Sequence, residues 1–279
     1  MDPDIRSFLE ELAAYDGFAP LSEAKAASLS HPDRVVTVSD GESLVAVGAS
    51  ATHKQLDGST HVSVETAIAP SLRFPEFEGR ILDAALDLVP TGVAHSVWSR
   101  RSSLDAALDE RKFGAIRSLA EMAIDLPIAG QERGSGGLSL RTFAEGDEET
   151  LIRINGAAFA DHREAGSLDQ AELAELMDAS WFDPAGILFH DVEGTVAAFC
   201  WTKVHGNGEG EIYRIGVDAP FRGLGIGAAI VEAGFTALAG RGCVTGMLWV
   251  DEANRAAMGL YEGIGMTVRA RNKEFARPT

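Results

Sequence analysis

The sequence predicts an α/β protein, an α+β fold with a mixed sheet, made of two similar domains in tandem. Its 279 residues exceed the ~100 to 200 residues of one common domain. Strand and helix patterns recur in a similar order on both sides of a segment rich in Pro, Gly and Ser. Two segments also match, "IAPSLR" at 68–73 and "VDAPFR" at 217–222. We therefore predict domains at 1–127 and 138–279, joined by a linker at 128–137.

The elements follow from the spacing of apolar residues, every second residue in strands and every third or fourth in helices. In the first half we expect helices at 4–14, 21–29, 78–89 and 103–112, a hairpin across "SDGE" (39–42), strands at 60–68 and 93–98, and a final strand. In the second half we expect strands at 138–143, 185–191, 195–205, 210–217, 244–250 and 266–275, with helices at 146–160, 168–178, 223–240 and 254–263.

Composition excludes several classes of protein. The content of 46 % hydrophobic and 24 % charged residues is typical of globular domains, and no apolar run reaches the ~18 residues of a membrane helix. The acidic N-terminus lacks the features of a secretory signal, so we expect a cytoplasmic protein without a membrane partner. Cys200 and Cys243 lie in apolar runs without metal-ligand spacing, which predicts buried thiols, no disulfide and no metal. The net charge of −18 argues against nucleic acid.

The glycines Gly223, Gly225 and Gly227 lie between a predicted strand and a long predicted helix. A P-loop needs Lys and then Ser or Thr after its last glycine, whereas two alanines follow here. A dinucleotide fold needs a long doubly wound domain and a ribose-binding acid ~20 residues on, and neither follows. With Arg222 the glycines form R-x-x-G-x-G, in which backbone amides approach a pyrophosphate at a helix N-terminus. A ligand-free turn is disfavoured, because each glycine at a helix start costs ~1 kcal/mol relative to alanine.

This motif is the signature of the GNAT acetyltransferase superfamily. A second segment resembles another part of the same superfamily. "LWVDEANRAAMGLYEGIGM" at 248–266 resembles the strand, asparagine, helix and tyrosine that close these domains. Asn254 is a suitable helix N-cap, and Tyr261 lies two turns later on the same face. Alone, Tyr261 would be interpreted as a core residue. Together with the glycine motif, the resemblance implies that it protonates the departing CoA thiolate.

A narrower resemblance lies upstream. "FCWTKVHGNGEGEIYRIGVD" at 199–218 resembles a segment of the actinobacterial mycothiol synthase family, tandem GNAT proteins that acetylate the cysteinyl amine of cysteinyl-glucosaminyl-inositol with acetyl-CoA. "AFADHREAGSLDQAEL" and "WFDPAGILF" also resemble that family, so that the likeness covers most of 138–279. In the first half it is confined chiefly to "DGFAPLSEA" at 16–24.

The resemblance implies a set of site residues. Acetyl-CoA would be bound by Ile215, Gly216 and Val217 along the pantetheine arm, by Arg222, Gly223, Leu224, Gly225, Ile226, Gly227 and Ala228 around the pyrophosphate, and by Asn254, Arg255, Ala256, Ala257, Met258 and Gly259. The acceptor would contact Glu23, Glu164, Lys203, Glu211 and Trp249, the last standing where the family usually has a tyrosine. As alternatives without a functional role, Glu23 and Glu164 would equally be solvent-exposed acids, and Lys203 would lie on the solvent-facing side of a strand.

Acetyl transfer needs an uncharged amine, a base and an acid. An α-amino group has a pKa of ~7.7 to 8.0, so that a modest base suffices. We expect Glu211 to act as this base, directly or through water. The backbone N–H of Val217 would donate to the developing oxyanion, and Tyr261 would then protonate the CoA sulfur.

The first half lacks these groups. When Arg73 is aligned with Arg222, Glu76 and Glu78 take the places of the last two glycines. When Gly114 is aligned with Gly265, Glu110 takes the place of the tyrosine. Carboxylates carry the wrong charge for phosphate, so we expect a catalytically silent domain that shapes the acceptor cleft.

Two other functions stay open. One is a tandem GNAT enzyme for another primary amine, such as an aminoglycoside or a peptide N-terminus. The other is a non-catalytic acyl-CoA sensor, which would need neither Glu211 nor Tyr261. We expect a monomer that binds acetyl-CoA and a small-molecule amine.

Overall fold

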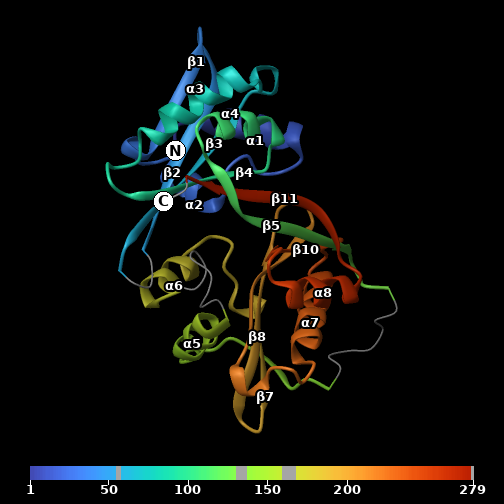
Figure 1. Ribbon diagram of the computed structural model, residues 1–279. Coiled ribbons are helices and arrows are strands. Elements are labelled where there is room, and N and C mark those ends of the chain that lie inside the picture. Colours follow the sequence, from blue (N-terminus) through green and yellow to red (C-terminus); the bar gives the residue numbers. More distant parts are fainter. Residues whose placement is uncertain (55–57, 130–136, 159–167, 278–279) are drawn as a thin grey trace. The chain divides into compact units, whose positions relative to one another are not determined.

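A computed structural model describes residues 1–54, 58–129, 137–158 and 168–277 (Figure 1). Most of the predicted linker, residues 130–136, and the candidate acceptor residue Glu164 lie outside the described residues. The chain divides into two compact units. Unit 1 consists of residues 1–118 and 272–279, and unit 2 of residues 119–271.

These units differ from the predicted domains at two strands, β5 (Gly114–Asp125) and β11 (Thr267–Ala276). The last part of β5 belongs to unit 2, where it pairs antiparallel with β10 (Thr245–Asp251). The last part of β11 belongs to unit 1, where it pairs antiparallel with β4 (Ala94–Ser99). Each strand thus ends one half of the sequence and completes the sheet of the other unit. The sequence pattern of a strand does not specify which sheet it joins.

The sheet of unit 2 has the order β6-β7-β8-β9-β10-β5. All neighbouring strands run antiparallel except β9 and β10, which are parallel. The strands not yet given are β6 (Leu140–Thr142), β7 (Ile187–Val192), β8 (Thr195–Val204) and β9 (Glu209–Val217). The other elements are α5 (Glu148–Ala158), α6 (Gln170–Met177), α7 (Ile226–Gly240), α8 (Arg255–Ile264) and the 3₁₀ turns η4 (Pro184–Gly186) and η5 (Ala219–Phe221).

Helices cover both faces of this sheet, with α5 and α6 on one side and α7 and α8 on the other (Figure 1). Side chains alternate along β8, so that Cys200 enters the core under α7 while Phe199 and Trp201 enter the core under α5 and α6. Cys200 and Cys243 are both free and buried, which confirms the interpretation of these residues as packing thiols.

Unit 1 has the order β1-β2-β3-β4-β11, with β3 and β4 parallel and the other pairs antiparallel. Its further strands are β1 (Val35–Asp40), β2 (Ser43–Lys54) and β3 (Thr60–Ile68). Its helices are α1 (Pro3–Asp16), α2 (Glu23–Ser28), α3 (Pro75–Leu86) and α4 (Asp105–Glu110), with the 3₁₀ turns η1 (Pro32–Arg34), η2 (Pro70–Leu72) and η3 (Ser102–Leu104). Both units are therefore mixed α/β sheets, as predicted.

One hydrogen bond recurs in both units and supports the alignment of the two halves. Arg73 Nε donates to the carbonyl oxygen of Ile68 at 2.9 Å, and Arg222 Nε donates to that of Val217 at 3.1 Å. In each unit the arginine follows a 3₁₀ turn and bonds back to the end of the preceding strand. Among the helices of the described residues, none has the length and apolar character of a membrane span.

Candidate active site

The parallel strands β9 and β10 separate along their length. They pair only at their first residues, through Thr245 with Glu209, Gly246 with Gly210 and Met247 with Glu211. Both strands are fully described, and beyond Met247 and Glu211 they no longer pair with each other. Backbone groups on this edge of β9 are therefore available to a ligand that lies in the opening.

The hydrogen bond at the end of β9 indicates which edge of the strand each backbone N–H faces. The N–H of Asp218 donates to the carbonyl oxygen of Ala197 on β8 at 2.9 Å. Because N–H groups alternate between the two edges of a strand, the N–H groups of Val217 and Ile215 face the opposite edge, toward β10. Of the three predicted pantetheine-binding residues, Ile215 and Val217 thus present backbone donors to the opening, whereas the N–H of Gly216 faces β8.

The glycine loop precedes α7, and the structure corrects our reason for assigning it to a ligand. The helix begins at Ile226 and not at residue 223, with Gly225 as its N-cap. Gly223 and Gly225 both have φ of +79°, where glycine is preferred over other residues, so they are required by the turn itself. Only Gly227 lies within the helix, where an added Cβ would lie 3.3 Å from Leu260 Cδ1. Glycine content alone therefore does not indicate a ligand.

The first turn of α7 gives a better indication. Its N-cap is a glycine, which has no side chain to accept a hydrogen bond from the first amides. Such amides, with the positive end of the helix dipole, favour an anion. This helix N-terminus follows β9, the strand whose edge borders the opening.

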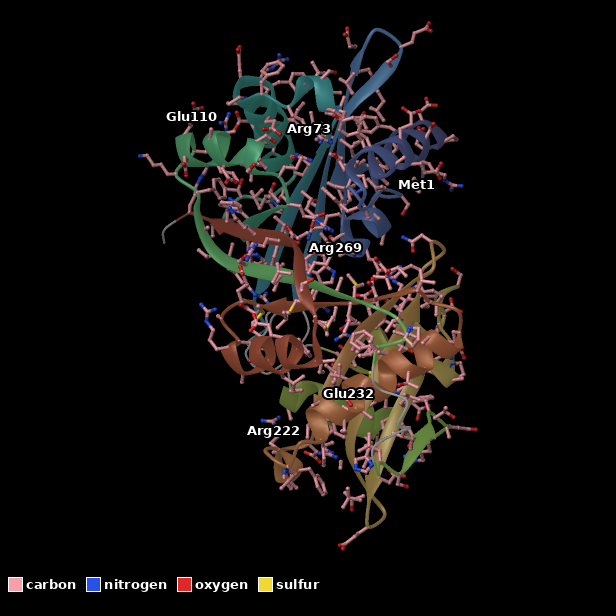
Figure 2. The ribbon with its side chains drawn as sticks, turned by 90° about the vertical axis from the view of Figure 1, so that its right-hand side faces the viewer. Met1, Arg73, Glu110, Arg222, Glu232 and Arg269 are labelled. Atoms are coloured by element: carbon pink, nitrogen blue, oxygen red, sulfur yellow. The ribbon has the colours of Figure 1, made fainter. Side chains whose placement is uncertain are left out.

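Arg222 supports the loop from outside (Figure 2). In addition to its bond with Val217, its Nη2 donates to the carbonyl oxygen of Ala157 at the end of α5, at 3.0 Å. A second contact links the same elements, because Arg153 Nη1 lies 2.7 Å from Asp218 Oδ2. The Arg222 guanidinium therefore holds the loop in place through two backbone carbonyl groups. This structural role was not predicted, and its contact with the pyrophosphate stays a prediction.

Helix α8 contributes the asparagine and the tyrosine. Asn254 is its N-cap, as predicted, and its Oδ1 accepts a hydrogen bond from the N–H of Ala257 at 3.1 Å. Tyr261 is buried in the core under α7 and α8, with 8 % of the residue exposed. Burial raises the pKa of Tyr261 to about 12, and Cys200 adds to this rise. The phenol therefore keeps its proton at neutral pH, as an acid for a leaving thiolate must.

Glu211 lies on β9 at the point where the strands separate. Its side chain is 13 % exposed, and Oε2 lies 2.9 Å from Nε2 of His205. Lys203 is directly opposite on β8 and is buried. Burial lowers the pKa of Lys203, whereas the charge of Glu211 raises it. The structure thus brings the predicted base and the predicted acceptor-binding lysine together.

A β-bulge shapes the same face. Trp201 on β8 is opposite Arg214 and Thr202 is opposite Ile212, so that Tyr213 has no partner in the register. As a result Tyr213 and Arg214 both point toward α5 and α6, where Arg214 bonds Glu172 at 2.9 Å.

Aromatic rings surround the lysine on this face. The rings of Trp181 and Tyr213 have centroids 5.0 Å apart, and the Lys203 ammonium lies 4.2 Å from the centroid of Trp181. His205, Trp181 and Tyr213 were not predicted as site residues. All three lie in segments that resemble the family, and the alternation of β9 places residues 211 and 213 on one face, which could have indicated Tyr213.

Trp249 lies on β10, directly opposite Glu121 of β5. Glu121 is buried and forms an ion pair with Arg269, which also contacts Glu209 at 2.6 Å. This pair, with Arg269 labelled in Figure 2, connects residues far apart in the sequence and was not predicted. Glu23 begins α2 of unit 1, two residues before Lys25, which pairs with Glu65 at 3.3 Å.

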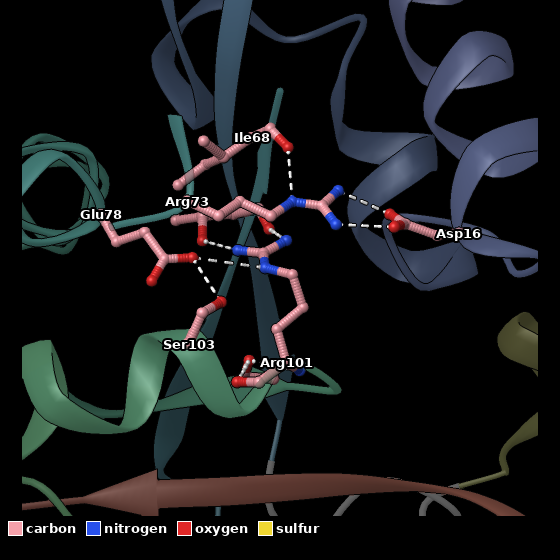
Figure 3. Close-up of polar contacts among 8 residues, drawn as sticks. Asp16, Ile68, Arg73, Glu78, Arg101 and Ser103 are labelled. Carbon is pink, nitrogen blue, oxygen red and sulfur yellow. Dashed lines mark hydrogen bonds and ion pairs between the residues drawn. The ribbon is translucent and has the colours of Figure 1, made fainter. Parts of the chain in front are cut away.

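In unit 1 the counterpart of the cofactor loop is closed by the protein's own carboxylates (Figure 3). The guanidinium of Arg73 makes two hydrogen bonds of 2.6 and 2.7 Å with Asp16. Glu78, aligned with Gly227, is completely buried, bonds Ser103 at 2.9 Å and lies 3.6 Å from Arg101. No glycine lies between β3 and α3, and the N-cap of α3 is Phe74. This arrangement supports the expectation that unit 1 does not bind acetyl-CoA through this loop.

Comparisons with known proteins agree with this geometry. The Acetyltransferase (GNAT) family matches residues 155–266. The mycothiol acetyltransferase of Thermobispora bispora is 36 % identical, covering 94 % of this chain and 91 % of that protein. That of Stackebrandtia nassauensis is also 36 % identical, covering 95 % of this chain and 91 % of that protein.

Solved structures show the same fold. The GCN5-related N-acetyltransferase from Sphaerobacter thermophilus has a TM-score of 0.71 at 21 % identity, with 99 % of this chain and 93 % of that chain covered. A tandem GNAT protein from the clavulanic acid biosynthesis pathway has a TM-score of 0.69 at 16 % identity, with 99 % and 96 % covered.

The parallel strands that separate, the helix that connects them and the family match together identify an acetyltransferase of the GNAT class. Both units have the mixed sheet of that fold, and the predicted fold class is confirmed. The identity with full-length relatives goes further: the chain belongs to the mycothiol acetyltransferase family.

Proposed function

We propose that this enzyme transfers the acetyl group of acetyl-CoA to the cysteinyl amine of cysteinyl-glucosaminyl-inositol, which gives mycothiol. The observation that carries the proposal is the position of Glu211. It is a partly buried carboxylate on the strand whose free edge presents the cofactor-binding amides, with Lys203 opposite. The family of the chain supports this choice of acceptor.

In this proposal the cofactor is bound by backbone groups. The N–H of Ile215 pairs with the pantetheine arm, the N–H of Val217 is left for the acetyl oxygen, and the first amides of α7 bind the pyrophosphate. Acetyl-CoA supplies an acetyl group already activated as a thioester. The segment from Asn254 to Gly259 completes the site.

The chemical steps need one base, one oxyanion donor and one acid. Glu211 accepts a proton from the ammonium form of the amine, and the neutral amine then attacks the thioester carbonyl. The nitrogen gives its second proton to solvent as the amide forms. The N–H of Val217 donates to the oxygen on which charge develops. Tyr261, whose phenol is protonated, gives its proton to the CoA sulfur as the carbon–sulfur bond breaks.

The acceptor is tested with a panel of amines. The enzyme is incubated with acetyl-CoA and cysteinyl-glucosaminyl-inositol, an aminoglycoside, a peptide with a free N-terminus, or glucosaminyl-inositol as the matched compound without cysteine. Release of CoA is followed as new thiol, and resistance of the product to hydroxylamine distinguishes an N-acetyl from an S-acetyl group.

We expect kcat/KM for the cysteinyl compound to exceed that of every other amine by at least about tenfold, the effect of ~1.4 kcal/mol. A higher value for the aminoglycoside or peptide would assign the enzyme to another primary amine. Binding of acetyl-CoA without turnover of any amine would favour the sensor. A cytoplasmic location, a monomeric state and the absence of a metal stay predictions.

A further inference from the structure

His205 lies at the end of β8, where the chain turns into β9. Its backbone N–H donates to the carbonyl oxygen of Glu209 at 2.8 Å, and this bond closes the hairpin. Gly208 in the turn has φ of +80°. The hairpin is therefore held by backbone groups and a glycine, and the His205 imidazole is not needed to form it.

The imidazole instead contacts the proposed base. Nε2 of His205 lies 2.9 Å from Oε2 of Glu211. A carboxylate oxygen can only accept a hydrogen bond, so Nε2 carries the hydrogen. The side chain of His205 is 33 % exposed and that of Glu211 is 13 % exposed, so the contact lies at the border between the site and solvent.

The groups that face Glu211 differ in what they can do for it. Lys203, from β8, supplies positive charge, but its ammonium lies over the rings of Trp181 and Tyr213. From β10 the residue in register is Met247, which is uncharged. His205, at the end of the same hairpin, supplies a side-chain hydrogen bond to the Glu211 carboxylate.

We propose that His205 is a positioning residue for the proposed base. Its Nε2–H holds Oε2 of Glu211 and leaves Oε1 to accept the amine proton. A glutamate side chain has three rotatable bonds, of which the last is loosely restricted, so that an unheld carboxylate would adopt the reactive geometry only part of the time.

This inference rests on the proposed function, in which Glu211 is the base. The test is a double-mutant cycle on the full chain with acetyl-CoA and the best amine of the panel, whichever amine that is. The variants are His205→Ala, His205→Gln, Glu211→Gln and the combination of His205→Ala with Glu211→Gln. His31→Ala, a change at an exposed histidine of unit 1, is the matched control.

For each variant kcat, both KM values, the Kd for acetyl-CoA and the thermal midpoint are measured at about pH 8.5, where free amine gives Glu211→Gln measurable turnover. We expect His205→Ala to lower kcat about tenfold, the loss of one charge-assisted hydrogen bond at a partly exposed site, with the Kd unchanged. His205→Gln should recover most of this loss, because its side-chain amide is also a donor. In the Glu211→Gln background, His205→Ala should change kcat less than about twofold.

An equal loss of kcat from His205→Ala in both backgrounds would overturn the inference, and so would a folded His205→Gln enzyme as slow as His205→Ala. If Glu211→Gln is impaired but His205→Ala has the wild-type kcat, the inference alone fails. If Glu211→Gln has the wild-type kcat at every pH, the proposed base fails together with it.

Discussion

Replacing Gly225 by alanine separates the two roles of the loop before α7, a tight turn and an anion site. Gly225 has φ of +79°, and an added Cβ would meet no atom of the described residues within 4 Å. The cost to folding is therefore the strain of a left-handed alanine, about 1 to 2 kcal/mol. Gly194, in the turn between β7 and β8, has φ of +81° and equally open space, and Gly194→Ala is the matched control.

We expect both variants to lose about 1 to 2 kcal/mol of unfolding free energy in chemical denaturation. Only Gly225→Ala should weaken acetyl-CoA binding, because its Cβ or a shifted loop disturbs the amides at the start of α7. Each hydrogen bond lost to a charged group costs about 1.5 to 3 kcal/mol, so the Kd measured by calorimetry should rise between about tenfold and 150-fold. A Gly225→Ala enzyme with reduced stability but the wild-type Kd would show that the loop is only a turn.

Three other predictions concern the stoichiometry, the acid and the stability in acid. Calorimetry should find one acetyl-CoA per chain, and Glu76→Ala in unit 1 should leave its Kd unchanged; two equivalent sites would contradict the assignment to unit 2. Tyr261→Phe should lower kcat without recovery at high pH, whereas an acyl donor with a more acidic thiol should partly restore it; recovery at pH 9 would argue against Tyr261 as the acid. Burial lowers the pKa of His53 from 6.5 to about 4, so that stability is present above pH 6.5 and falls as pH decreases toward 4. Between pH 7 and pH 4.5 that fall should be about 2 kcal/mol, and smaller in His53→Gln, as measured by urea denaturation.

Local elements of the fold could be predicted because local patterns determine them. The strand predicted at 60–68 coincides with β3, and Asn254 caps α8 as its side chain and position suggested. The start of α7 was misplaced because the backbone angles of Gly223 and Gly225 are not visible in a hydrophobic pattern. Glycine is favoured in a turn with positive φ but destabilises the interior of a helix, and the sequence alone does not distinguish the two cases.

Long-range features of the site were beyond sequence reasoning. The pairing of Glu121 with Arg269 joins residues on two strands far apart in the chain, and neither residue stands out in its segment. The contact of His205 with Glu211 depends on the hairpin between β8 and β9 and on the register of those strands. The assignment of Glu211 and Tyr261 came from a family resemblance, and their roles stay predictions.

The exchange of terminal strands between the two units has a consequence for the history of this enzyme. Unit 2 has the cofactor loop and the tyrosine, yet its sheet ends with residues 119–125, which are encoded in the first half of the gene. A shortened gene for the second half alone would leave the edge of β10 without its partner and Glu121 missing from the ion pair with Arg269. An exposed strand edge favours aggregation, so selection for activity in unit 2 would also preserve the half that we predict to be silent. The first half lacks the glycines and the tyrosine, but its last strand completes the sheet of unit 2.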